Sequence, residues 1–108
     1  MTENTPIRGA KVDHSTSGIG HGVTTVTTAG TDVVLAASTP VKWVVIQAQT
    51  DNSGIIAVGG SGVDATVATG TGVALAVGES ISLFIDNLAN VFIDATMPGE
   101  GVRYIYGT

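Results

Sequence analysis

Residues Gly78–Ala95 read GESISLFIDNLANVFIDA, and this stretch decides the fold class of the chain. Two apolar runs, ISLFI and VFIDA, flank a five-residue segment, Asp86–Asn90, whose composition suits a hairpin loop. If Ile85 pairs with Val91, the alternation of side chains along both strands gives one wholly apolar face and one mixed face. The stretch therefore predicts a β-hairpin whose apolar face pairs Ile85 with Val91, Leu83 with Ile93, and Ile81 with Ala95.

The composition of the whole chain also favours strands. Valine, isoleucine and threonine supply 39 of the 108 residues, whereas lysine, arginine and glutamate together supply 7. The first group is enriched in strands, and the second is typical of helix surfaces. The 15 glycines suit tight turns between short strands. At 108 residues, the chain is long enough for one domain with a hydrophobic core.

Charge and cysteine content exclude several classes of function. The formal net charge is -5, which opposes the attraction to phosphate that dominates nucleic-acid binding, so we expect no nucleic-acid partner. The chain has no cysteine, so neither disulfides nor thiolate metal sites are expected. We see neither the basic-then-apolar pattern of a signal peptide nor an apolar run of about 18 residues, so we expect no membrane span.

Residues 1–21 predict an extended N-terminal arm, followed by one domain over residues 22–108. Glycine and proline interrupt the arm, and its apolar residues are too scattered to define a face. Its two basic residues, Arg8 and Lys11, balance two acidic ones, so all the net charge lies on the domain. Two interpretations stay open: a loose chain end, or an arm that becomes ordered on a neighbouring subunit.

Short β-rich runs separated by turn residues continue through residues 22–108. A weak repeat with a period of forty relates Gly30–Ala36 to Gly70–Ala76 and indicates two similar halves. Seven to eight short strands without a helical period predict an all-β fold: an antiparallel β-sandwich, jelly-roll-like or Greek key. The expected strands are 22–28, 33–37, 41–49, 55–58, 73–77, 81–85, 91–95 and 102–106, with 65–67 as the candidate for one more.

No group of residues combines into a catalytic or metal site. Gly59–Val67 fits most of a calcium-binding nonapeptide, but it occurs once and lacks the large apolar eighth residue, so a glycine-rich loop is favoured. His14 and His21 lie in the arm, without a cysteine or a helix to fix a ligand geometry. Asp86 and Asp94 fall on the proposed loop and strand edge, where solvated carboxylates are expected. We therefore expect no catalysis and no metal or other cofactor.

Apolar residues are too numerous for one sandwich to bury. Trp43, Tyr104 and Tyr106 share strand faces with apolar neighbours and are expected in the core. The opposite, nominally outer faces also carry large apolar residues, which indicates contacts between subunits. We therefore predict a homo-oligomer, preferably a trimer, whose interface includes Val44, Ile46, Phe84, Phe92 and Ile105.

Four segments within residues 41–108 carry a family resemblance: VVIQAQTDNSGIIAVGG, ALAVGESISLFIDNL, VFIDA and GEGVRYIYG. They resemble small virion proteins of tailed bacteriophages, the head decoration (cement) and head-fibre proteins. The resemblance implies a β-sandwich or jelly-roll subunit that assembles, often as a trimer, on the outer surface of the capsid. There it would reinforce contacts between major capsid proteins without catalysis.

Under this resemblance the protein acts by binding alone, since many copies bury apolar area across capsid subunit boundaries. We expect the arm to meet an acidic capsid surface through Arg8 and Lys11, with Ile7 and Val12 as its apolar anchors. The alternative is a tail or fibre module that binds a host receptor or a glycan, which an exposed aromatic groove would favour.

Overall fold

The computed structural model describes residues 16–108, and within that range it confirms an all-β fold. Eight strands and one short 3-10 helix are present there, in agreement with the expected seven to eight strands. In chain order the elements are β1 (Ile19–Val26), β2 (Val33–Val34), β3 (Trp43–Ala48), β4 (Ile56–Gly59), β5 (Val73–Leu75), β6 (Ser80–Leu83), η2 (Leu88–Asn90), β7 (Phe92–Ala95) and β8 (Glu100–Gly107).

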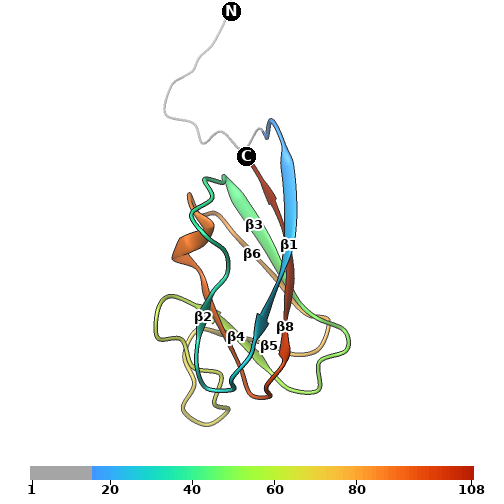
Figure 1. Ribbon diagram of the computed structural model, residues 1–108, viewed down its shortest axis with the longest axis vertical. Coiled ribbons are helices and arrows are strands. Elements are labelled where there is room, and N and C mark those ends of the chain that lie inside the picture. The colour runs from blue at the N-terminus through green and yellow to red at the C-terminus, as the bar shows by residue number, and fades with distance from the viewer. Residues whose placement is uncertain (1–15) are drawn as a thin grey trace, which may run out of the picture.

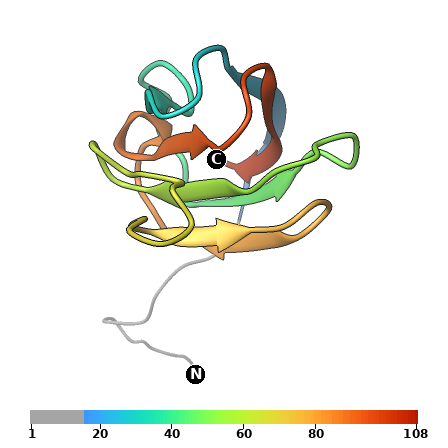
Figure 2. The same ribbon diagram turned by 90° about the horizontal axis from the view of Figure 1, so that it is seen from below.

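The strands form two four-stranded antiparallel sheets that pack face to face. Sheet A has the order β1-β8-β3-β6, and sheet B has the order β2-β7-β4-β5. Figure 1 shows β1 and β8 side by side, running roughly from top to bottom of the view. In Figure 2 the same order descends through both sheets, from β1 and β2 at the top to β6 and β5 at the bottom. This is the strand order of an eight-stranded jelly roll, a double-sheet arrangement of two Greek keys.

The predicted hairpin is wrong, because its two strands lie in different sheets. β6 pairs with β3 in sheet A, whereas β7 pairs with β4 and β2 in sheet B. The apolar face of the prediction is nevertheless the inward one, since Ile93 is buried in the core cluster and Leu83 packs against it. They meet the same core from opposite sheets instead of standing side by side in one sheet.

The segment between β6 and β7 crosses from sheet A to sheet B and is held by its own contacts. Leu88 of η2 is buried, and the side chain of Asn87 caps this helix by accepting a hydrogen bond from Ala89 N at 2.9 Å. The same Asn87 oxygen accepts from Thr39 N at 3.0 Å, and Asn87 forms an isolated β-bridge with Pro40. These contacts with a distant loop replace the pairing that a hairpin would supply.

The core lies between the two sheets and takes side chains from alternate positions of every long strand. Valine and isoleucine dominate it, and burial of each such side chain stabilises the fold by roughly 1.5–3 kcal/mol. Sheet A supplies Val26, Val44, Ile46, Ala48 and Val102, while sheet B supplies Ile56, Val58, Leu75, Ile93 and Ala95.

Two large aromatic side chains enlarge the inward face of sheet A. Tyr104 and Tyr106 of β8 pair with Gly22 and Gly20 of β1, and both tyrosines pack against the core, as expected from the sequence. Their ring centroids lie 6.2 Å apart. A Cβ atom at either glycine would overlap the ring of the tyrosine opposite it. The alternation Gly-x-Gly in β1 therefore makes room for Tyr-x-Tyr in β8.

Two details of the structure differ from the expectations drawn from the sequence. β1 begins at Ile19, so the sheet starts before the predicted domain boundary at residue 22. Residues 65–67 form no strand; they belong to the long loop of residues 60–72 between β4 and β5. The forty-residue repeat has a structural counterpart, because it relates β2 to β5, which are the two edge strands of sheet B.

The turn after β3 is fastened to the start of β8 by two side chains. Asn52, which is buried, donates to Gly101 O at 2.9 Å and accepts from Gly101 N at 3.3 Å. The Glu100 carboxylate accepts from Ser53 N at 2.6 Å, from Ser53 Oγ at 2.7 Å and from Gly54 N at 2.9 Å. The hydrogen bonds from Ser53, followed by that from Gly54, hold the pKa of Glu100 below its usual value.

Replacing Gly22 with valine is expected to cost about 1–3 kcal/mol of unfolding free energy, because the new side chain overlaps the Tyr104 ring. Urea denaturation measures this cost. In the matched control, Gly60→Ala, the added Cβ meets no atom within 4 Å, and little change is expected. The cost of Gly22→Val should shrink in a Tyr104→Ala background. Equal costs in both backgrounds would contradict the proposed packing.

The Glu100 contacts predict a stability term that depends on pH. Because the pKa of Glu100 is lowered in the folded protein, these contacts stabilise the fold fully above the ordinary pKa of glutamate. Their stabilisation is lost as the pH falls through the pKa of the folded state. Denaturation midpoints measured between neutral and acidic pH should therefore fall less steeply for Glu100→Gln than for the wild type. Two parallel pH profiles would show that Glu100 contributes nothing to acid sensitivity.

Candidate functional site

The outer face of sheet A is the strongest candidate for a functional surface. Its side chains come from the positions of β1, β8, β3 and β6 that alternate with the core positions. Registered neighbours form three rows across the sheet: Ile19–Gly107–Trp43, His21–Ile105–Val45–Ser82, and Val23–Arg103–Gln47–Ser80. Arg103 is the only charged residue in these rows.

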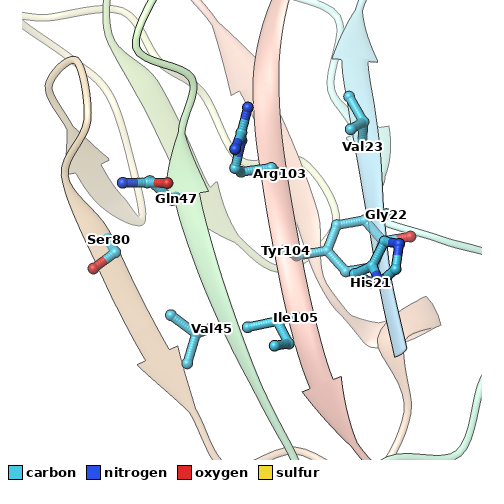
Figure 3. A pocket seen from close by; sticks show the side chains of 9 residues that line it. All are labelled: His21, Gly22, Val23, Val45, Gln47, Ser80, Arg103, Tyr104 and Ile105. Carbon is cyan, nitrogen blue, oxygen red and sulfur yellow. The ribbon is translucent and has the colours of Figure 1, made fainter. Parts of the chain in front are cut away.

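The middle of this face is hollowed into a shallow depression of about 480 Å³ (Figure 3). Val45 and Ile105 lie side by side on its floor, and Gln47 and Ser80 approach from the β3 and β6 side. The Gln47 amide is held in place because it donates to Gly78 O at 3.1 Å. The remaining lining residues are His21, Gly22, Val23, Arg103 and Tyr104.

One margin of the face exposes a surplus of apolar surface. Ile19 is 69 % exposed, Val23 64 % and Ile105 42 %. Trp43 also lies on this face, contrary to the expectation that it belongs to the core. Its indole Nε1 donates to Thr16 Oγ1 at 2.9 Å. Single exposed apolar residues are ordinary, but neighbouring ones on a sheet face with a single charged residue, Arg103, indicate a contact surface.

Tyr104 reaches from the core side to the edge of the depression. Figure 3 shows its ring extending from β8 towards β1 beside Gly22. Burial raises the pKa of the Tyr104 phenol, the neighbouring Tyr106 raises it further, and a hydrogen bond with Thr24 opposes the shift. The phenol is therefore neutral at physiological pH and available only as a hydrogen-bonding group.

The outer face of sheet B differs, because the chain's own loop covers it. Within the 60–72 loop, Val63 and Ala65 are buried against Ala57 of β4, and Phe92 of β7 packs on the same cluster. Asp94 of β7 is buried beneath this loop, where its Oδ2 accepts from Ala65 N at 2.9 Å. Its Oδ1 has no hydrogen-bond partner among the described residues. The expectation that Asp94 is a solvated carboxylate is therefore wrong.

The structure corrects part of the predicted oligomer interface. Val44 and Ile46 are wholly buried in the core, so they cannot contact another subunit. Both faces of β3 carry apolar side chains, so the alternation of residues along the strand could not show which face points inward. Phe84 is 74 % exposed, Ile105 lies on the outer face of sheet A, and Phe92 is half-buried under the 60–72 loop.

The predicted capsid-contact residues Ile7, Arg8, Lys11 and Val12 lie outside the described residues, as does His14. His21 lies within β1. The Asp64 carboxylate of the glycine-rich motif accepts from Thr66 N at 2.9 Å and Thr66 Oγ1 at 2.7 Å, and these bonds lower its pKa. In residues 16–108, no three His, Cys, Asp or Glu side chains gather in a way that could hold a metal ion.

Sequence reasoning missed the outer face of sheet A as a site. It placed Ile105 there but not its neighbours Val23, Arg103 and Gln47, which come from three different strands. The pattern Gly20-x-Gly22 against Tyr104-x-Tyr106 was a usable signal, because it aligns β1 with β8. That alignment fixes which residues of β1 share a face with Ile105.

The fold is a jelly-roll β-sandwich domain. The 60–72 loop covers the outer face of sheet B, whereas residues 16–108 leave the outer face of sheet A exposed. Comparison with models of protein families, with curated proteins and with solved structures finds no match to this chain. None of the helical segments in the described range has the length and hydropathy needed to span a bilayer.

Asp94→Ala is expected to cost about 1–3 kcal/mol of unfolding free energy, because it leaves the buried Ala65 N–H without an acceptor. Asp94→Asn keeps an acceptor oxygen and should cost less. Urea denaturation measures both variants, and limited proteolysis reports whether the 60–72 loop has loosened. An alanine variant as stable as the wild type would show that this hydrogen bond does not hold the loop.

Proposed function

We propose that this chain is a structural protein of a tailed-bacteriophage virion, a capsid decoration (cement) protein that binds the outer head lattice and stabilises it without catalysis. One observation carries the proposal: the exposed apolar margin of sheet A, formed by Ile19, Val23 and Ile105. A protein that works by burying surface against a lattice needs such a margin.

The resemblance described above supports the proposal. Its first segment spans β3, the turn that Glu100 fastens, and β4. Its second spans β5, β6 and the crossing segment, and the last two are β7 and β8. The similar segments are thus six strands of the sandwich. Jelly rolls occur in viral capsid domains, and this analogy between folds adds to the case without deciding it.

In this proposal the partners are the major capsid protein and further copies of the chain, assembled as a homo-oligomer, with a trimer preferred. Many identical copies on one lattice turn modest contacts into strong avidity. The N-terminal segment with Ile7, Arg8, Lys11 and Val12 supplies the capsid-contact arm, while the outer face of sheet A supplies apolar area.

A tail or fibre module that binds a host receptor or glycan is the second candidate. The depression on sheet A favours it, because its volume of about 480 Å³ lies within the range typical of ligand sites. His21, Gln47, Ser80 and Arg103 would offer hydrogen bonds to sugar hydroxyls, and Val45 and Ile105 an apolar floor. Jelly rolls also occur in lectin domains.

The deciding experiment counts the copies of this protein in purified particles of its source phage, by quantitative peptide mass spectrometry against the major capsid protein. We expect on the order of hundreds of copies per particle, because only the head lattice repeats one surface that often. A handful of copies would move the protein to the tail or a fibre and favour the second candidate, and absence from particles would contradict both.

Ile105→Glu should lower the number of copies retained on particles roughly tenfold, because a charge then enters the apolar contact. Val67→Glu is the matched control, since Val67 is 84 % exposed on the 60–72 loop at the other sheet. Equal losses for the two variants would show that sheet A is not the attachment face.

A further inference from the structure

Strand β1 is a long open edge of sheet A. In the described part of the chain, β8 is its only strand partner, and Figure 1 shows β1 at the outer margin of the molecule. The other three sheet edges are short: β2 has two residues, β5 three and β6 four, whereas β1 has eight. Proteins normally keep edge strands short or otherwise protected, so β1 is the exception here.

Hydrogen bonds around β8 show which backbone groups of β1 face the open side. Gln49 N donates to Gly101 O at 3.1 Å, so odd-numbered residues of β8 bond towards β3. Thr108 N donates to Gly18 O at 2.9 Å, so even-numbered residues bond towards β1. Even-numbered residues of β1 therefore bond to β8, and odd-numbered ones direct their N–H and C=O groups outward. The outward-directed residues are Ile19, His21, Val23 and Thr25.

Nothing in the sequence of β1 protects this edge. The strand reads IGHGVTTV, without proline, lysine, arginine, aspartate or glutamate, which are residues that discourage pairing between sheet edges. Its outward side chains include Ile19 and Val23, which are 69 % and 64 % exposed. Within residues 16–108, the edge thus combines backbone groups that no other strand pairs with exposed aliphatic surface, as a strand does when it accepts another strand.

We propose that β1 pairs antiparallel with β1 of a second copy, so that two sheets A join into one eight-stranded sheet. The register sets Ile19 opposite the partner's Val23 and places His21 on the two-fold axis. Three residue pairs then exchange backbone hydrogen bonds, and each aliphatic side chain meets another. A shift by two residues would instead set Val23 opposite the partner's His21.

Charge and length favour a second copy as the occupant. Each chain has a formal net charge of -5, yet β1 carries no carboxylate. Two copies can therefore meet at this edge without placing like charges opposite each other. Two identical edges also match in length, which the four-residue edge of β6 would not do. Such a contact closes on two copies, so the predicted trimer would have to form through another surface.

A single cysteine at position 21 tests the register, and the absence of native cysteine makes the test clean. Hydrogen-bonded partners in an antiparallel pair have Cα atoms about 5.5 Å apart, a separation that a disulfide can span. Mild oxidation of His21→Cys should give a disulfide-linked dimer much faster than oxidation of Val67→Cys, the exposed control. Equal rates, or no cross-link at position 21, would overturn the proposed register.

Light scattering of the purified chain tests the edge itself and needs no virion, so its outcome is separate from that of the proposed function. We expect twice the 10.8 kDa mass of one chain, falling to one chain for Val23→Pro. Proline there removes an outward N–H but no bond to β8, and circular dichroism and urea denaturation check that the variant still folds. The conservative variant Val23→Thr should remain a dimer.

Two results would overturn the proposal. The first is a wild-type chain that stays monomeric at every concentration. If hydrogen exchange then finds the amides of Ile19, His21 and Val23 protected, another segment of the same chain occupies the edge. The second is an oligomer whose mass Val23→Pro leaves unchanged.

Discussion

The packing of the inward faces of sheets A and B against each other is the interaction on which the rest of the structure depends. Val44 and Ile46 from sheet A share one core with Ile56 and Ile93 from sheet B, and all four are wholly buried. Sheet B has edge strands of only two and three residues, too short to be stable by backbone bonding alone. Burial between the layers therefore holds the strands in place, and the crossing segments follow from it.

The same packing determines the shape of sheet A. Because Tyr104 and Tyr106 fill the inward side of β8, the strand beside them needs glycine at the paired positions. At these two positions β1 contributes no side chain to the core. Its residues Ile19 and Val23 point outward, whereas Val26 at its end is buried. Together with Ile105, Ile19 and Val23 form the apolar outer margin, which is the surface that the functional proposals use.

The outer faces of the two sheets differ in whether the chain itself covers them. On sheet B, the 60–72 loop buries Val63 and Ala65 and covers Asp94, so that face is occupied within the chain. On sheet A, residues 16–108 leave a depression with one charged group, Arg103, and an unprotected edge. The proposed attachment to a lattice and the proposed pairing with a second copy share Ile19 and Val23 of β1, whereas Ile105 of β8 belongs to the attachment face alone.

The sequence alone predicted the all-β class, a range of seven to eight strands and the inward side chains of the Gly78–Ala95 stretch, because alternation along a strand is local. It could not determine that β6 and β7 lie in different sheets, since two facing sheets and one hairpin bury the same residues. It also could not decide which apolar face of β3 points inward, or that the 60–72 loop covers Asp94. Only the tertiary structure decided these points, because strand partners and loop positions depend on packing between residues far apart in the chain.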